Sequence, residues 1–232
     1  DAGKSPVKVA LVYGVQRDPF FAAMVRGAKA KAAELGVELS VDGPEYWDPT
    51  LQIPILEKTI AQQPAAICIA AVDPNDLVEP LQAASADGIH ILSVDTYIGN
   101  NAGDYTSGSI TFPLSYIASD NVEGGRIACQ ALIDAMGGKG KIYIQKVHDG
   151  ITTLEQRAEG CREAILATNG AVELARVDVT EGDNQAARLL QGTFKDVPGV
   201  NGVFFTSWYT VDGALRGLDD AGAPAQVGAE RH

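Results

Sequence analysis

Hydrophobic and polar positions alternate along this chain in blocks. Short apolar runs of strand length are each followed by a longer segment in which apolar residues recur every three to four positions. This order of strand and helix predicts α/β structure with parallel sheets built from βαβ units. We expect strands at residues 7–12, 38–41, 67–71, 89–94, 141–147, 172–177 and 202–206. In an open parallel sheet, ligands bind at the carboxyl ends of the strands, so those ends are where functional residues are expected.

Local signals mark where the predicted helices begin. Asp18 is a candidate N-cap, and Pro19 suits the first position of the helix that follows it. Asp120 and Glu123 have the spacing of a capping box at the start of a later helix. One helix is less regular, because two prolines fall near its start. We therefore expect its regular part to begin only after Ile53.

One segment interrupts the pattern. Residues 97–116 are rich in glycine, asparagine and serine, and a stretch of that length without an element is typical of a functional loop or of a crossing between domains. We therefore predict an N-terminal α/β lobe at residues 1–118 and a C-terminal α/β lobe at residues 119–232. Residues 227–232 carry little strand signal, so the second lobe is one unit short and its C-terminal part is expected to be missing.

The composition excludes two classes of protein. Acidic residues outnumber basic ones and give a formal net charge of −12, whereas nucleic-acid binding needs clustered Lys and Arg. No run approaches the roughly 20 apolar residues that a membrane-spanning helix needs. We expect no signal peptide within this chain. Its polar start, residues 1–5, suits a processed mature terminus and equally a trimmed chain.

The chain has three cysteines. Cys68 lies inside an apolar strand, where a cysteine behaves as a small hydrophobic residue. Cys129 and Cys161 lie on two helices of the second lobe. A bridge between them is possible in an oxidising compartment, but two separate buried thiols are the preferred interpretation. Their spacing has no zinc or CxxC signature, and we expect neither a metal nor a cofactor.

Polar and aromatic residues follow the predicted strand ends, and these are the candidates for ligand binding. A carboxylate such as Asp95 accepts charge-assisted hydrogen bonds from hydroxyls, and a guanidinium such as Arg157 donates from a rigid fork. An aromatic ring such as Trp208 covers the C–H face of a sugar. The full set is Tyr13, Arg17, Asp18, Phe20, Asp95, Thr96, Tyr97, Arg157, Asp183, Ser207 and Trp208.

Each candidate also has a structural explanation. Asp18 could act only as a helix cap, and Asp95 could cap the turn after its strand. Arg157 could be a solvated charge paired along its helix, and Trp208 could pack within its loop. Catalysis is the weakest interpretation, because no GxSxG, HExxH or GxxxxGK[ST] motif occurs.

At these residues the chain resembles the type I periplasmic solute-binding proteins of the ribose-binding group. The similarity covers nearly the whole chain in the same order. The matching motifs are Arg17-Asp18-Pro19-Phe20-Phe21 after the first strand, Ile117-Ala118-Ser119-Asp120-Asn121 with Gly124-Gly125 at the start of the second lobe, Arg157-Ala158-Glu159-Gly160, and residues 202–205 followed by Gly213-Ala214-Leu215-Arg216.

The resemblance implies two doubly wound lobes joined by a hinge, with a sugar captured between them. It implies a monomeric periplasmic protein that delivers its ligand to an ABC permease in the inner membrane. It carries ligand contact onto Asp18, Phe20, Asp95 and Arg157. A periplasmic sensor that presents the bound molecule to a membrane receptor is the alternative, and a sugar-modifying enzyme is a weaker one.

The chain departs from the family pattern at two strand ends. Pentose-binding members carry Arg where this chain has Thr96, and Asn-Asp where it has Ser207-Trp208. Ribose itself is therefore not the expected ligand, and we expect a sugar, polyol or cyclitol. The family's last strand in the second lobe, and the return crossover after it, are not expected in this chain.

Overall fold

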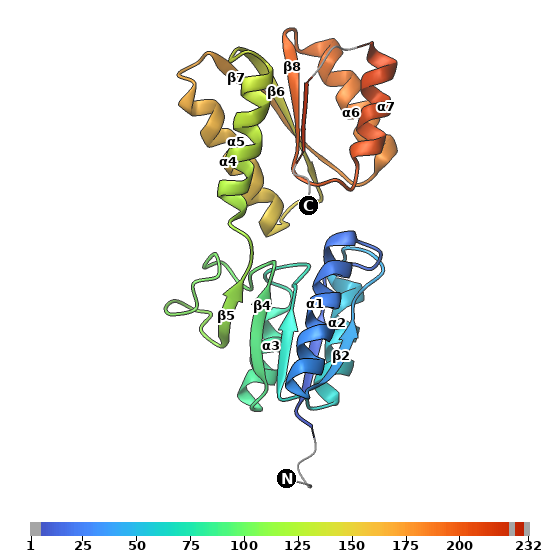
Figure 1. The fold of residues 1–232 in the computed structure, drawn as a ribbon, viewed down its shortest axis with the longest axis vertical. Helices are drawn as coiled ribbons and strands as arrows, with labels where there is room; N and C mark the ends of the chain where they lie inside the picture. The colour runs from blue at the N-terminus through green and yellow to red at the C-terminus, as the bar shows by residue number, and fades with distance from the viewer. Residues whose placement is uncertain (1–5, 223–225, 230–232) are drawn as a thin grey trace. The chain divides into compact units, whose positions relative to one another are not determined.

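The structure, a computed structural model, describes residues 6–222 and 226–229. The chain divides into two compact units, Asp1–Ala118 and Ser119–His232. Each is a parallel sheet with helices packed on its faces (Figure 1). The predicted α/β class is confirmed. Within the described residues, no helix is both long enough and apolar enough to cross a bilayer.

The first unit holds a five-stranded parallel sheet in the order β2-β1-β3-β4-β5. Helices α2 and α3 cover one face and α1 covers the other (Figure 1). The main apolar core lies under α2 and α3, where Leu56 and Leu81 meet Ile67 and Ile91 of the sheet. The elements are β1 (Lys8–Val12), α1 (Pro19–Leu35), β2 (Glu38–Asp42), α2 (Pro49–Ala61), β3 (Ala66–Ile69), α3 (Val78–Ala86), β4 (His90–Val94) and β5 (Pro113–Ile117).

Two predictions for the first unit were wrong. Helix α2 begins at Pro49 instead of after Ile53, because Asp48 caps it and Pro49 occupies the first turn, where a missing N–H costs nothing. Pro54 lies inside this helix. The segment at residues 97–116, predicted to lack an element, runs into β5, an edge strand that begins at Pro113 and pairs with β4. A proline is tolerated there because it opens an edge strand.

The second unit holds a four-stranded parallel sheet in the order β7-β6-β8-β9. Helices α4 and α5 pack on one face of it and α6 and α7 on the other (Figure 1). The Asp120 carboxylate accepts from the Glu123 amide at 3.0 Å, as the capping box predicted. The elements are α4 (Asn121–Ala135), β6 (Gly140–Val147), α5 (Thr152–Ala167), β7 (Val172–Thr180), α6 (Asp183–Asp196), β8 (Val200–Phe205), α7 (Val211–Ala221) and β9 (Gln226–Ala229).

Strand β9 corrects the expectation that the end of this chain adds no strand to the second lobe. It pairs in parallel with β8, with Gly202 opposite Gln226. Its short sequence contains a glycine and no long apolar run, so the pattern alone did not identify it. Pairing with a neighbouring strand, rather than local hydrophobicity, makes this segment a strand.

The preference for two separate thiols was also wrong. Cys129 of α4 and Cys161 of α5 form a disulfide, with their Cα atoms 5.0 Å apart. The two helices approach closely because glycines face the contact: a Cβ on Gly160 would collide with the Val122 carbonyl oxygen. Cys68 carries a free thiol, and burial raises its pKa above the ordinary value.

Candidate functional site

The predicted site residues come after the carboxyl ends of parallel strands, either in the connecting turns or in the helices that follow. In the first unit they follow β1 and β4, and in the second they follow β6, β7 and β8 or lie in the helix after the strand. The first set is Tyr13, Arg17, Asp18, Phe20, Asp95, Thr96 and Tyr97, and the second is Arg157, Asp183, Ser207 and Trp208. Open parallel sheets carry their ligand sites at this edge.

The turn between β1 and α1 uses part of its predicted set for folding. The Asp18 carboxylate accepts from the Phe20 amide at 2.7 Å and so caps α1. The half-buried Phe20 ring meets Phe21 edge to face, with centroids 5.3 Å apart. Arg17 is exposed and has a positive φ of 64°. Asp18 therefore has the capping role that was its structural alternative, while Phe20 stays partly accessible.

Tyr13 belongs to an aromatic group beside that turn. Its ring packs against Gly43, and a Cβ on Gly43 would collide with the ring. The centroids of the Tyr13 and Phe21 rings are 6.0 Å apart. Burial, and then the charge of Asp42, raise the pKa of Tyr13, so its hydroxyl remains protonated. Trp47 also stacks on Phe21, with ring centroids 6.1 Å apart, and its indole N–H donates to the Val72 carbonyl oxygen at 2.8 Å. This indole serves packing.

Asp95 directly follows β4 in a left-handed backbone conformation, with φ 64° and only 9% exposure. Its amide donates to the Ile117 carbonyl at 2.9 Å, and its own carbonyl accepts from the Tyr116 hydroxyl at 2.8 Å. The buried Thr96 hydroxyl donates to the Ala71 carbonyl at 2.7 Å and links the ends of β4 and β3. Tyr97, the next residue in the chain, is half-buried. The backbone of Asp95 is thus held by β5 at this strand end, and a carboxylate there is an acceptor for hydroxyl groups.

Arg157 is buried and oriented from two directions. Its Nε donates to the Asn121 carboxamide at 2.9 Å, and its Nη1 donates to the Thr206 carbonyl at 3.0 Å. Gly125 permits this arrangement, because a Cβ there would collide with the Arg157 carbonyl oxygen. The solvated-charge alternative is therefore wrong. Asn121 was missed as a site residue, although it begins α4 in a motif that the resemblance had already singled out.

The remaining predicted residues of the second unit are more exposed. Trp208 is 43% exposed, and its ring meets Tyr209 edge to face with centroids 6.2 Å apart. The Ser207 hydroxyl accepts from the Tyr209 amide at 3.3 Å. Asp183 lies in the first turn of α6 and pairs with Arg216 of α7 at 3.4 Å. Trp208 thus offers an accessible apolar face, while the Asp183 carboxylate has a partner on its own unit.

Lys146 is a buried charge that the sequence reasoning passed over. It interrupts the apolar run of β6, which was the available signal, and its ammonium pairs with Glu155 of α5 and with Asp149 at 3.3 Å. Glu155 is two residues before Arg157 in the helix. The pair therefore ties the first turn of α5 to the end of β6.

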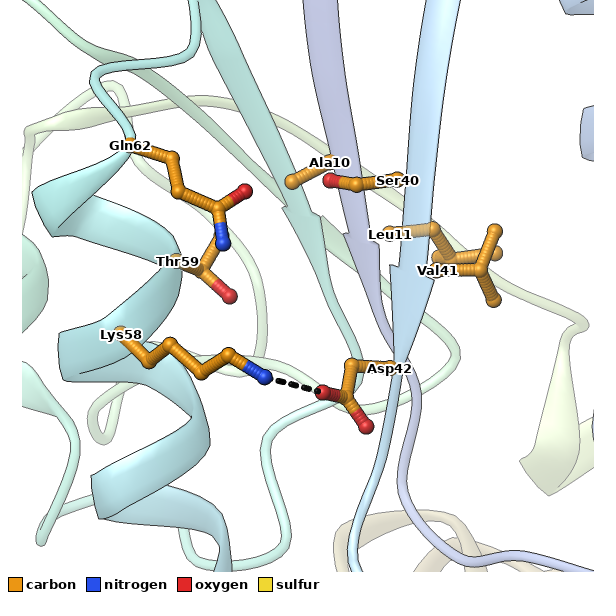
Figure 2. A pocket seen from close by; sticks show the side chains of 8 residues that line it. All are labelled: Ala10, Leu11, Ser40, Val41, Asp42, Lys58, Thr59 and Gln62. Carbon is orange, nitrogen blue, oxygen red and sulfur yellow. Dashed lines mark ion pairs between the residues drawn. The ribbon is translucent and has the colours of Figure 1, made fainter.

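A cavity of about 190 Å³ lies elsewhere in the first unit, between α2 and the strands β1 and β2 (Figure 2). Lys58 and Asp42 form an exposed ion pair across it at 3.8 Å. The cavity is lined by Ala10, Leu11, Ser40, Val41, Asp42, Lys58, Thr59 and Gln62, and no predicted site residue is among them. Over the described residues, no cluster of three His, Cys, Asp or Glu side chains could hold a metal ion.

Known proteins match almost the whole chain. The periplasmic binding protein domain family matches residues 9–229. The ribose import binding protein of Salmonella typhimurium is 27% identical over 92% of this chain and 68% of its own length. A solute-binding protein of an ABC transporter from Agrobacterium vitis, solved with α-D-tagatopyranose, is 36% identical. The match covers 96% of this chain and 76% of that one, with a TM-score of 0.89.

A more distant structure shares the fold. The Caulobacter myo-inositol binding protein, solved with myo-inositol, has a TM-score of 0.79 at 21% identity, over 98% of this chain and 76% of that one.

Proposed function

Because the chain belongs to the periplasmic binding protein family, we propose that it captures a sugar or a related polyol or cyclitol for an ABC importer. The observation that carries this proposal is Arg157, a buried guanidinium oriented by Asn121 and Thr206 at the carboxyl end of a parallel sheet. A guanidinium held in this way loses little conformational entropy when it binds hydroxyl oxygens, and this favours affinity.

The ligand contacts proposed are the predicted residues at the strand ends of each unit. Asp95 supplies an acceptor for hydroxyl groups and Arg157 a donor, while Phe20 and Trp208 supply apolar faces. Thr96 and Trp208 stand where pentose-binding members carry other residues. The 36% identity to a protein solved with tagatopyranose also supports a ligand other than ribose.

The proposal includes the cellular setting. The protein acts as a monomer in the periplasm, where an ABC permease accepts its ligand. The disulfide between Cys129 and Cys161 supports this location, since disulfides persist in the periplasm and are rare in the cytosol. The Salmonella typhimurium and Agrobacterium vitis relatives are named as import and ABC-transporter binding proteins, which favours import over a sensor role or a sugar-modifying enzyme.

Isothermal titration with D-tagatose, D-ribose and myo-inositol tests this function, with L-leucine as the negative control. We expect one-to-one binding of at least one of the three and recovery of the compound unchanged. A free sugar concentration of 100 times Kd should also raise the free energy of unfolding by about 2.7 kcal/mol. Binding of none of the three would contradict the proposed ligand class, and a new product by NMR would indicate an enzyme.

A further inference from the structure

Asp95 holds an unfavourable backbone conformation at the proposed binding edge. Its φ of 64° lies in the left-handed region, which costs a residue with a side chain, although Asp tolerates it better than most. Such strain persists only where the surroundings enforce it, and it concentrates at ligand-binding sites. Two neighbours on β5 enforce it here: the Ile117 carbonyl accepts the Asp95 amide, and the Tyr116 hydroxyl donates to the Asp95 carbonyl.

The Tyr116 ring is itself fixed. Tyr97 meets it edge to face, with centroids 6.0 Å apart and an interplanar angle of 88°. On another side it contacts Gly103, which has a φ of 84° and where a Cβ would collide with the ring. Burial, and then the charge of Asp95, raise the pKa of Tyr116. The hydroxyl therefore remains protonated and remains a donor to the Asp95 carbonyl.

The loop between β4 and β5 supports this arrangement. The Tyr105 hydroxyl lies 2.7 Å from the Ser93 hydroxyl of β4 and accepts from the Ile98 amide at 2.8 Å. Ile98 and Ile110 are buried in the core of the first unit. The loop is thus packed against the sheet, and its glycine-rich part places Gly103 in contact with the Tyr116 ring.

We propose that Tyr116 is a positioning residue for ligand binding, whose hydroxyl holds Asp95 in its left-handed conformation and so sets the direction of the carboxylate. This proposal rests on the proposed function, in which Asp95 accepts hydrogen bonds from the ligand. Tyr116 acts through Asp95 and needs no contact with the ligand itself.

The experiment compares Tyr116→Phe with the wild-type protein, using D-tagatose, D-ribose and myo-inositol as probes for titration. Phenylalanine keeps the ring against Tyr97 and Gly103 and removes only the hydroxyl. Hydrogen exchange of the Asp95 amide, measured without any sugar, reports the backbone directly, because this amide is bonded to Ile117. Tyr143→Phe is the matched control: it removes the hydroxyl of a buried tyrosine that bonds Asp178 at 3.1 Å in the second unit.

We expect Tyr116→Phe to raise Kd at least tenfold and to speed exchange at Asp95, while Tyr143→Phe changes neither. Unchanged affinity in a protein that binds a probe would overturn the proposal, as would weaker binding with unchanged exchange. If the wild-type protein binds no probe, the proposed function fails. Hydrogen exchange of the Asp95 amide then tests only the contact between Tyr116 and Asp95. Faster exchange in Tyr116→Phe supports this contact, and unchanged exchange refutes it.

Discussion

Arg157 takes part in both folding and the proposed binding, because its guanidinium is bonded to Asn121 and to the Thr206 carbonyl. We expect Arg157→Ala to weaken sugar binding by about 2–5 kcal/mol, the scale for truncating one partner of a buried charge-assisted contact. The same change should lower the free energy of unfolding by about 1–3 kcal/mol, since the Asn121 carboxamide loses a buried partner.

Titration and urea denaturation on the same variant check both effects of Arg157→Ala. Arg162→Ala is the control, because Arg162 lies on the same helix and pairs with Glu159 near its surface. It should leave affinity unchanged and stability within about 0.5 kcal/mol. Unchanged sugar affinity in Arg157→Ala would remove Arg157 from the binding site.

Substitution of Trp208 tests the apolar contact that is proposed for the ligand. Trp208 is 43% exposed, so truncation removes less packing than it would at a buried tryptophan. An aromatic face that stacks on a sugar contributes dispersion and loses hydration on binding. We therefore expect Trp208→Ala to weaken sugar binding with little change in Tm. Tyr46→Ala, at another exposed aromatic residue outside the predicted set, should change neither. A lower Tm with intact binding would instead assign Trp208 to packing.

At the scale of elements, the pair of helices α4 and α5 carries both Asn121 and Arg157, and the disulfide joins the two helices. The cysteines are 32 residues apart, and a bridge across that separation stabilises by about 3–4 kcal/mol in the chain-entropy account. Cys161→Ser should therefore lower the free energy of unfolding by about this amount. It should also weaken sugar binding, because Arg157 follows any shift of α5.

Urea denaturation with and without reductant checks the disulfide prediction. Reductant should destabilise the wild-type protein and leave Cys161→Ser unaffected. Cys68→Ser retains the bridge and serves as the control. Equal stability with and without reductant, together with three reactive thiols in the unfolded, unreduced chain, would show that the bridge does not form.

At the scale of the whole molecule, the alternating pattern predicted the α/β class and most of the parallel strands. These features are local: an apolar run or a helical period is visible within one segment. The two strands that were missed, β5 and β9, have weak patterns of their own. Pro113 opens the first and Gly228 lies inside the second, and each becomes a strand by pairing with a neighbour already in place.

As with the strands, the sequence indicated part of the candidate site and missed the rest. The sequence indicated Asp95, Arg157 and Trp208, because each follows a strand end and ligand sites lie at that edge. It did not indicate that Thr96 would bond the Ala71 carbonyl or that Asp183 would pair with Arg216. Both partners come from other elements, so the geometry of neighbouring strands and helices had to be known first.

The sequence by itself determined the fold class, the helix starts marked by Asp18 and Asp120, and the resemblance to sugar-binding proteins, because capping residues, periodicity and motifs act within a few positions of the chain. Only the tertiary structure decided which side chains hold the functional ones. Asn121 meets Arg157 across 36 residues, and Tyr116 meets Asp95 across 21. The Cys129–Cys161 bridge likewise required α4 and α5 to pack closely. Such contacts form only when distant segments meet, and no local pattern encodes their distances.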